Sequence, residues 1–186
     1  MWEILAANPV ANLWGVVCVA LGATWPLYKT RRGVLWAQAA VHVAFSLHFY
    51  LLGAYTGSLM NALGLGQALA AIPLGKKPGF KIIYLLTLPV IAAGAVLTWQ
   101  GVPSVFSSLA LAMFSLARYQ TNIMAMRVLM LLGILGWTVH DILVLSIPGL
   151  AADAISFATS LWMIRREMKF ARLSEARSEA VAKPEK

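Results

Sequence analysis

The sequence is poor in charge and in cysteine. Only 12% of its 186 residues are charged, whereas 60% are apolar, a balance far from that of soluble domains. A single cysteine, Cys18, excludes a disulfide bond within the chain. The sequence contains no HExxH, no Walker loop, no Cys/His cluster with metal-ligand spacing and no nucleophile elbow. We therefore expect neither an enzyme nor a bound metal or cofactor.

What the sequence does contain is long apolar runs with almost no charge. About 20 helical residues, each rising 1.5 Å, cross a hydrocarbon core about 30 Å thick. The runs do not alternate as the strands of a membrane barrel do. We predict an all-α integral membrane protein, with residues 1–164 as one membrane domain and 165–186 as a charged cytoplasmic tail. The seven predicted transmembrane helices are 9–28, 33–53, 59–75, 82–99, 103–119, 124–146 and 149–164.

All 15 basic residues fall on one side of such a bundle. They follow the first, third and seventh spans or flank the connection between the fifth and sixth, while the connections at 54–58, 100–102 and 147–148 carry none. Basic residues are retained in the cytoplasm, which predicts an outside N-terminus and a cytoplasmic C-terminus. The net charge of +8 therefore reflects topology. We expect the lipid bilayer, and no nucleic acid, as a partner.

Two stretches that start 92 residues apart share a pattern. LHFYLLGAYTGSLMN at 47–61 and VHDILVLSIPGLAAD at 139–153 each place a histidine thirteen residues before an asparagine or aspartate. Gly57 and Gly149 occupy the same place between them. The same shift superposes spans one to three on spans five to seven without a gap.

This shift leaves the fourth span without a counterpart. Because three is an odd number, a connecting helix is needed to give both halves the same orientation in the membrane. The sequence therefore predicts a 3+1+3 arrangement of two parallel triple-helix repeats, one of the known transporter plans. The first repeat is 9–75, the linker helix is 82–99, and the second repeat is 102–164.

Polar residues inside these spans are the candidate site. An aspartate at a helix centre costs about 2.5–3.5 kcal/mol on insertion scales, so Asp153 is expected to face the protein interior. His140 and Asp153 are both about 10 Å from the turn between their helices, so they can meet across the hairpin, as can His48 and Asn61. Asp141 points about 100° away from His140. Two interpretations stay open: a solute or proton site, or hydrogen bonds that lock the hairpins.

Three further residues have weaker signals. His42 lies on another face of its helix and is interpreted as a packed, hydrogen-bonded histidine. Arg127, about one turn inside its span, is expected to extend its side chain to the cytoplasmic interface, with an inner gate as the alternative. Pro26 ends the first span and is a candidate hinge.

The 3+1+3 plan with an outside N-terminus resembles the SWEET sugar transporters and their PQ-loop relatives. The motifs HFYLLGAYTGSLMNA in span two and R…GWTVHD…G…D in span six, followed by Arg165 and Arg166, resemble the bacterial YgjV family of inner-membrane proteins over most of 10–166. This resemblance implies a seven-helix fold in the bacterial inner membrane. SWEET proteins line their pocket with asparagines of the third and seventh helices, which implies such positions for Asn61 and Asp153.

The sequence also departs from those relatives. The Pro-Gln dipeptide of PQ-loop proteins is Pro26-Leu27 here, and the second repeat has Ala117-Arg118 instead. A proline hinge is therefore expected in one half at most. We expect a carrier of a small polar or cationic solute. A homo-oligomeric form of this carrier is compatible with the sequence. The alternative is a non-transporting membrane receptor or assembly protein in which the polar residues are structural.

Overall fold

The computed structural model describes residues 8–75 and 77–182, and this part of the chain is all helical. The predicted seven helices are present in it, so the all-α fold is confirmed. Three basic residues counted in the orientation argument, Lys76, Lys183 and Lys186, lie outside the described residues. The α-helices are α2 (Pro9–Thr24), α3 (Arg31–Leu51), α4 (Tyr55–Ala71), α5 (Ile82–Leu97), α6 (Val102–Tyr119), α7 (Ile123–Leu143) and α8 (Ile147–Ala182).

Side-chain caps fix where several helices start. Asn8 precedes α2, and its side-chain oxygen accepts a hydrogen bond from the amide of Ala11 at 3.2 Å. Thr30 caps α3 in the same way through the amide of Gly33. Asn122 caps α7 by accepting from two amides of its first turn. Such oxygens satisfy amides that have no partner within the helix, which stabilises a helix start by about 1 kcal/mol.

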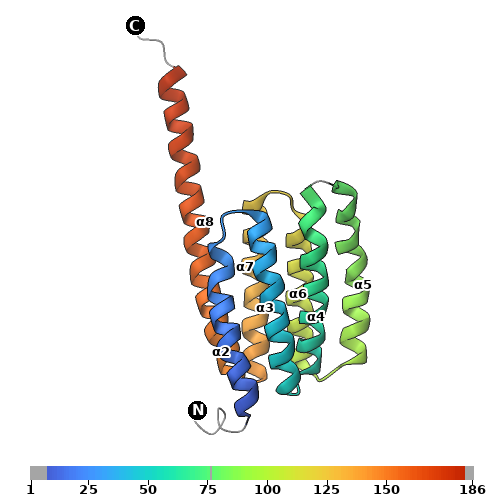
Figure 1. Ribbon diagram of the computed structural model, residues 1–186. Helices are drawn as coiled ribbons and strands as arrows, with labels where there is room; N and C mark the ends of the chain where they lie inside the picture. Colours follow the sequence, from blue (N-terminus) through green and yellow to red (C-terminus); the bar gives the residue numbers. More distant parts are fainter. Residues whose placement is uncertain (1–7, 76, 183–186) are drawn as a thin grey trace.

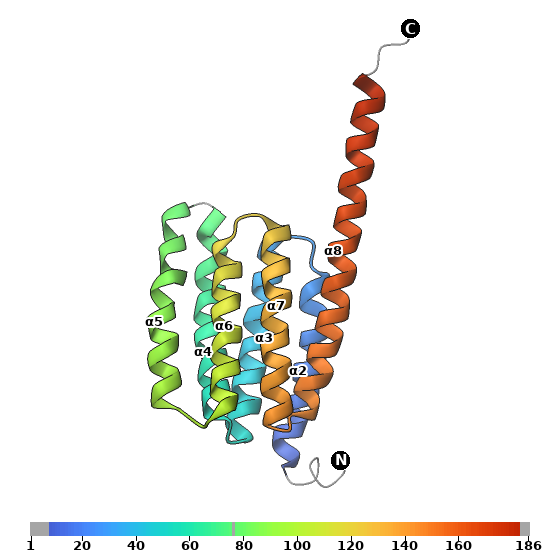
Figure 2. The ribbon, with the colours of Figure 1, turned by 180° about the vertical axis from the view of Figure 1, so that it is seen from behind.

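Six of the helices form a closed ring. Successive helices run in opposite directions, and α2 packs on α3, α3 on α4, α4 on α6, α6 on α7, and α7 on α8 (Figure 1). Contact between α8 and α2 closes the ring. Helix α5 lies outside it, against α4 and α6, at one edge of the bundle (Figure 2). The centre of the molecule is therefore lined by every described α-helix except α5.

Five helices in the described part of the chain are long and apolar enough to cross a membrane. They are Pro9–Leu27, which includes a final 3₁₀ turn, α3, α6, α7 and the Ile147–Ser174 part of α8. Helix α5 is a shorter apolar helix, and α4 has 17 residues. Apolar residues face outward from the bundle, as lipid contact requires: Val96 and Leu97 are 75% and 84% exposed.

The positions of proline and glycine explain where α4 and α8 end. Helix α4 starts at Tyr55 rather than at 59 and gives way to a 3₁₀ turn at Ile72–Gly75, where Pro73 lacks the amide hydrogen that an α-helix needs. The charged tail is helix-prone, and α8 continues through it without a break to Ala182. No glycine or proline lies between 150 and 183, so nothing in this sequence ends the helix. Its last turns project beyond the bundle (Figure 1).

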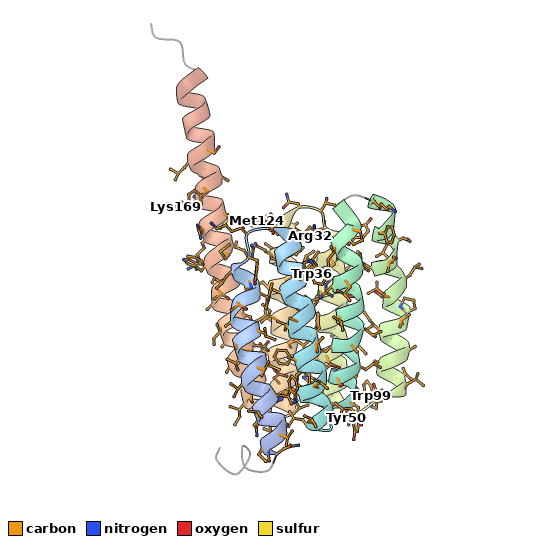
Figure 3. The ribbon with its side chains drawn as sticks, viewed as in Figure 1. Arg32, Trp36, Tyr50, Trp99, Met124 and Lys169 are labelled. Carbon is orange, nitrogen blue, oxygen red and sulfur yellow. The ribbon has the colours of Figure 1, made fainter. Side chains whose placement is uncertain are left out.

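The two ends of the bundle differ in charge. Arg32 and Lys169 lie at the end from which α8 projects, whereas Tyr50 and Trp99 lie at the opposite end (Figure 3). We call these the basic end and the non-basic end. The connections at the non-basic end, around Gly53, Gln100 and Ser146, carry no basic residue.

Candidate functional site

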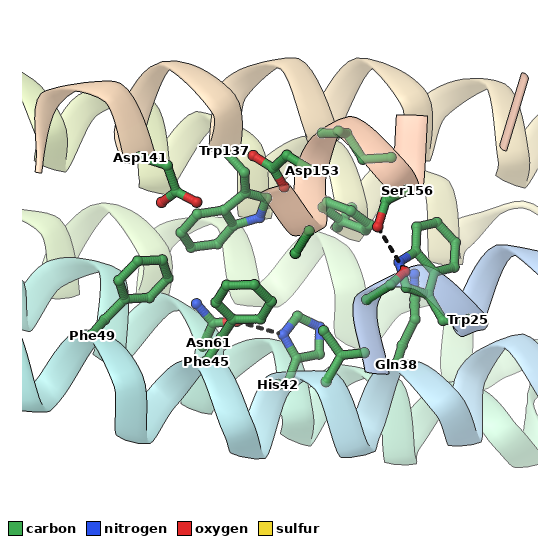
Figure 4. A pocket seen from close by; sticks show the side chains of 15 residues that line it. Trp25, Gln38, His42, Phe45, Phe49, Asn61, Trp137, Asp141, Asp153 and Ser156 are labelled. Carbon is green, nitrogen blue, oxygen red and sulfur yellow. Dashed lines mark hydrogen bonds between the residues drawn. The ribbon is translucent and has the colours of Figure 1, made fainter. Parts of the chain in front are cut away.

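A small cavity lies in the middle of the six-helix ring. Its volume of about 50 Å³ has room for a few water molecules, since each needs about 10–15 Å³. Its polar lining residues are Gln38, His42, Asn61, Asp141, Asp153 and Ser156. Its aromatic lining residues are Trp25, Phe45, Phe49, Phe114 and Trp137 (Figure 4).

The structure brings three of the five main candidate residues to this cavity. Asn61 lines it from α4, Asp141 from α7 and Asp153 from α8. His48 and His140 do not line it. Both are buried, and each lies within one turn of the end of its helix at the non-basic end.

The predicted pairing of His48 with Asn61 is wrong. His48 Nδ1 lies 2.8 Å from the carbonyl oxygen of Ala11, and its Nε2 lies 2.9 Å from Ser146 Oγ. Asn61 instead accepts a hydrogen bond from His42 Nδ1 at 2.9 Å. The two histidines are six residues apart and so point about 120° apart around α3, which packs between α2 and α4. His42 consequently faces α4, while His48 faces α2.

The predicted pairing of His140 with Asp153 is also wrong. His140 Nδ1 lies 2.9 Å from Oδ1 of its neighbour Asp141, and both side chains are almost completely buried. The imidazole of His140 contacts the carboxyl group of Asp141 although the two side chains leave the helix about 100° apart. Oδ2 of Asp153 has no hydrogen-bond partner among the described residues. Asp153 is thus a buried carboxyl group with an open oxygen beside the cavity.

The paired glycines found in the sequence have a shared structural role. A β-carbon at Gly57 would lie 2.7 Å from His140 Nε2, closer than side-chain packing allows. A β-carbon at Gly149 would collide with the carboxyl group of Asp141. Each glycine therefore makes room for one of two neighbouring polar side chains of α7.

His42 belongs to a network that the sequence analysis missed. Its Nε2 lies 2.7 Å from Nη2 of Arg118, which is fully buried. Because a guanidinium only donates hydrogen bonds, Nε2 must be unprotonated, and the neutral ring then donates from Nδ1 to Asn61. The interpretation of His42 as a hydrogen-bonded histidine is confirmed, yet it also lines the cavity.

Arg118 is held by neutral groups. It donates to Gln67 Oε1 at 2.8 Å and to Gln38 Oε1 at 3.3 Å, and no described carboxylate forms an ion pair with it. From the sequence, Arg118 was expected to flank the connection between the fifth and sixth spans at the cytoplasmic side. The signal that could have corrected this was the presence of two glutamines inside apolar spans, because buried amides need strong partners. One wall of the cavity is therefore neutral and backed by a cation, whereas the other carries two acids.

Two other arginines join the helices at the basic end. Arg127 is only 1% exposed, so the expectation that it reaches the interface is wrong. Its guanidinium donates to the carbonyl of Pro26 at 2.7 Å and lies 3.2 Å from a carboxylate oxygen of Glu167. Arg31 donates to the carbonyl of Arg118 at 3.1 Å. Pro26, the candidate hinge, and Arg127, the candidate gate, are thus in direct contact.

The spacing of 92 residues recurs around the cavity. Gln38 Nε2 lies 3.2 Å from the sulfur of Met130, its counterpart under that shift. Pro26 and Arg118, whose carbonyls each accept a hydrogen bond from an arginine side chain, are also 92 residues apart. Five pairs of lining residues have this spacing: Gly22 and Phe114, His42 and Ile134, Phe45 and Trp137, Phe49 and Asp141, and Asn61 and Asp153.

The sequence was compared with known families and structures. Residues 9–170 match the family model Imp-YgjV, described as a bacterial inner membrane protein. The chain belongs to this family. The resemblance inferred from the motifs of spans two and six is therefore confirmed, and this YgjV-family protein resides in the bacterial inner membrane. No curated protein and no solved structure gave a match.

Proposed function

We propose that this YgjV-family protein is a carrier of a small polar or cationic solute, with the central cavity as its binding site. The observation that carries the proposal is Asp153, whose Oδ2 is buried beside the cavity without a partner. An acid in the membrane interior must pair, bind a proton or line a solute path. No described cation pairs with it, so a solute or a proton is left as the group that completes the site.

The aromatic lining favours a cationic solute. Trp25 and Trp137 face the cavity together with three phenylalanines. The face of an aromatic ring attracts a cation, by about 2 kcal/mol or more when both are shielded from water. Asp141 adds a second acid to the same wall, whereas Asn61 and His42 offer neutral hydrogen-bonding groups opposite it (Figure 4). The protein has no enzymatic role in this proposal.

The proposed architecture is two parallel triple-helix units, α2–α4 and α6–α8, joined by α5. The recurrent spacing of 92 residues around the cavity supports this arrangement, as does the position of α5 outside the ring. The two halves then correspond to those of SWEET and PQ-loop proteins. The gathering of basic residues at one end supports a cytoplasmic C-terminus and an outside N-terminus.

A specific observation favours the second candidate, a receptor or assembly protein in which polar groups only hold the helices together. His42, His48 and Asn61 all have protein partners, so most of the polar interior is already satisfied. In that case Asp153 contributes to stability through its side-chain hydrogen bond with Thr138 of α7. The two proposals therefore differ in what they expect of Asp153.

Uptake of radiolabelled methylammonium into proteoliposomes tests the carrier, with a panel of neutral solutes of similar size as further probes. We expect saturable uptake that is lost in Asp153→Asn. Ser160→Ala is the matched control, because Ser160 is buried on the same helix but does not line the cavity. If no probe enters faster than into empty liposomes, and Asp153→Asn lowers the melting temperature, the receptor or assembly role is correct instead.

A further inference from the structure

A second pocket opens at the non-basic end of the bundle. Its volume is about 250 Å³, and Gly53 and Gln100, from two of the connections at that end, form part of its rim. Thr56 and Gly57 of α4 and His140 of α7 line it farther in. Because connections rather than helix centres surround its mouth, this outer pocket faces the aqueous phase.

His140 and Asp141 lie between the outer pocket and the central cavity. His140 lines the outer pocket, Asp141 lines the cavity, and their side chains are joined by the 2.9 Å contact between Nδ1 and Oδ1. One pair of hydrogen-bonded side chains therefore touches both spaces. In a helical membrane protein, intramembrane acids and histidines arranged in this way are typical of proton paths.

His140 differs from the other two histidines in its free nitrogen. His140 Nε2 has no hydrogen-bond partner among the described residues, although the ring is fully buried. Both ring nitrogens of His42 and of His48 have partners. The nitrogen left open on His140 is the one next to Gly57, which also lines the outer pocket.

The surroundings of His140 keep the ring in place without competing for its protons. The rings of Phe49 and Trp137 pack edge to face against it, with centroids 4.9 and 5.3 Å away. A β-carbon at Gly57 would lie 2.7 Å from Nε2, so the glycine leaves the approach from the pocket free of a side chain. Water needs only a small local opening over this glycine to reach the nitrogen.

We propose that His140 and Asp141 form a proton relay from the outer pocket to the central cavity. In the starting state, neutral His140 donates its Nδ1 hydrogen to the Asp141 carboxylate. A hydronium ion in the outer pocket protonates Nε2, and the Nδ1 proton then passes to Oδ1 of Asp141. This leaves a neutral carboxylic acid and an imidazole protonated at Nε2. Asp141 releases the proton into the cavity. Water then takes up the Nε2 proton and returns one to Nδ1, which restores the starting tautomer, so one proton has moved and no electrons have.

The other titratable groups near the relay are few. Asp153 on α8 lines the same cavity as Asp141 and is the natural next acceptor. Cys18 on α2 is buried within electrostatic reach of Asp141, and His48 on α3 has both nitrogens occupied. From α4 and α6, the residues that line the outer pocket are Thr56, Gly57, Pro103 and Ser104, none of which titrates. The purpose of the relay, coupling a proton to solute movement, rests on the proposed carrier function.

Deuterium exchange at the C2 carbon of each histidine tests access from the outer pocket. This exchange requires a protonated ring and contact with water, and mass spectrometry resolves it for each histidine. In the purified protein we expect His140 to exchange at least tenfold faster than His42 and His48, which serve as internal controls. Equal, slow exchange of all three histidines would overturn the relay.

Proton influx into proteoliposomes tests transfer. A potassium gradient with valinomycin supplies the voltage, and a trapped pH dye reports protons, without any solute. In the wild type and in His48→Gln, we expect proton influx above that of empty liposomes. In His140→Gln and in Asp141→Asn we expect this influx to be lost. Two relay variants are used so that the test remains possible if one of them does not fold. Wild-type influx equal to that of empty liposomes refutes the relay, even if the C2 hydrogen of His140 exchanges quickly. Undiminished influx in both folded relay variants also refutes it.

The two proposals can fail separately. Methylammonium uptake without proton influx would leave the carrier standing and remove the relay. Proton influx without uptake of any probe solute would leave the relay standing and remove the carrier.

Discussion

Replacing Gly57 by alanine is the sharpest test of the packing around His140. The added β-carbon would lie 2.7 Å from Nε2 and 2.8 Å from Cε1 of His140, whose ring packs edge to face against Phe49 and Trp137. Overpacking of a filled interior typically costs 1–3 kcal/mol. Alanine is a better helix former than glycine, but the gain is at most about 1 kcal/mol. We therefore expect a net loss of about 1–2 kcal/mol.

Gly66→Ala is the matched control on the same helix. No atom lies within 4 Å of a β-carbon at Gly66, so only the gain in helix propensity should remain. Thermal unfolding in detergent, followed by tryptophan fluorescence, measures both variants. At about 2–4 °C per kcal/mol for a chain of this size, Gly57→Ala should lower the melting temperature by several degrees. Gly66→Ala should leave it unchanged or raise it slightly.

A double-mutant cycle identifies the cause. If the loss comes from the contact with His140, then Gly57→Ala should cost little in a His140→Ala background, because the space that the ring filled is empty. Equal melting temperatures for Gly57→Ala and Gly66→Ala would refute the reasoning. So would a loss in Gly57→Ala that persists in full when His140 is alanine.

Three further predictions concern buried polar groups. Arg127→Gln should lower the melting temperature more than Glu167→Gln. Hydrogen bonds from a charged donor to buried carbonyls contribute about 1.5–3 kcal/mol each, whereas the ion pair with Glu167 contributes less because Glu167 is 26% exposed. Comparable losses of melting temperature in the two variants would contradict this. Asp153→Asn should leave the melting temperature of the solute-free protein unchanged or raise it, since an unpaired buried acid opposes folding. Cys18 should resist maleimide labelling in the folded protein and react fully in denaturing detergent, as its 0% exposure requires.

The sequence predicted the helices because their signal is local. Long apolar runs, polar caps such as Asn8 and Thr30, and short connections each depend on neighbouring residues only. The same holds for the family, since its motifs lie within single spans. The start of α4 was predicted four residues late, because Thr56, Gly57 and Ser58 in its first turn are polar or small and look like part of the connection.

Side-chain partners could not be predicted in the same way. Equal distance from a turn places two residues at similar depth, but it says nothing about the direction in which each side chain leaves its helix. His48 and Asn61 satisfy the first condition and fail the second. Arg118 shows the complementary limit: its position near a connection indicated solvent, while its three partners come from α3 and α4, distant in sequence.

The proposed repeat has a consequence for how the cavity selects its solute. Asp141 corresponds to Phe49 and Asp153 to Asn61, so both acids belong to the second half while the first half offers an aromatic ring and an amide. Arg118 also belongs to the second half, but it donates to Gln38, His42 and Gln67 of the first half. The charge distribution around the cavity is asymmetric, with the acids on α7 and α8 and the cation behind the wall formed by α3 and α4. A solute bound here would orient its positive group toward α7 and α8, which makes those helices, rather than the whole ring, the part of the cavity that determines charge preference.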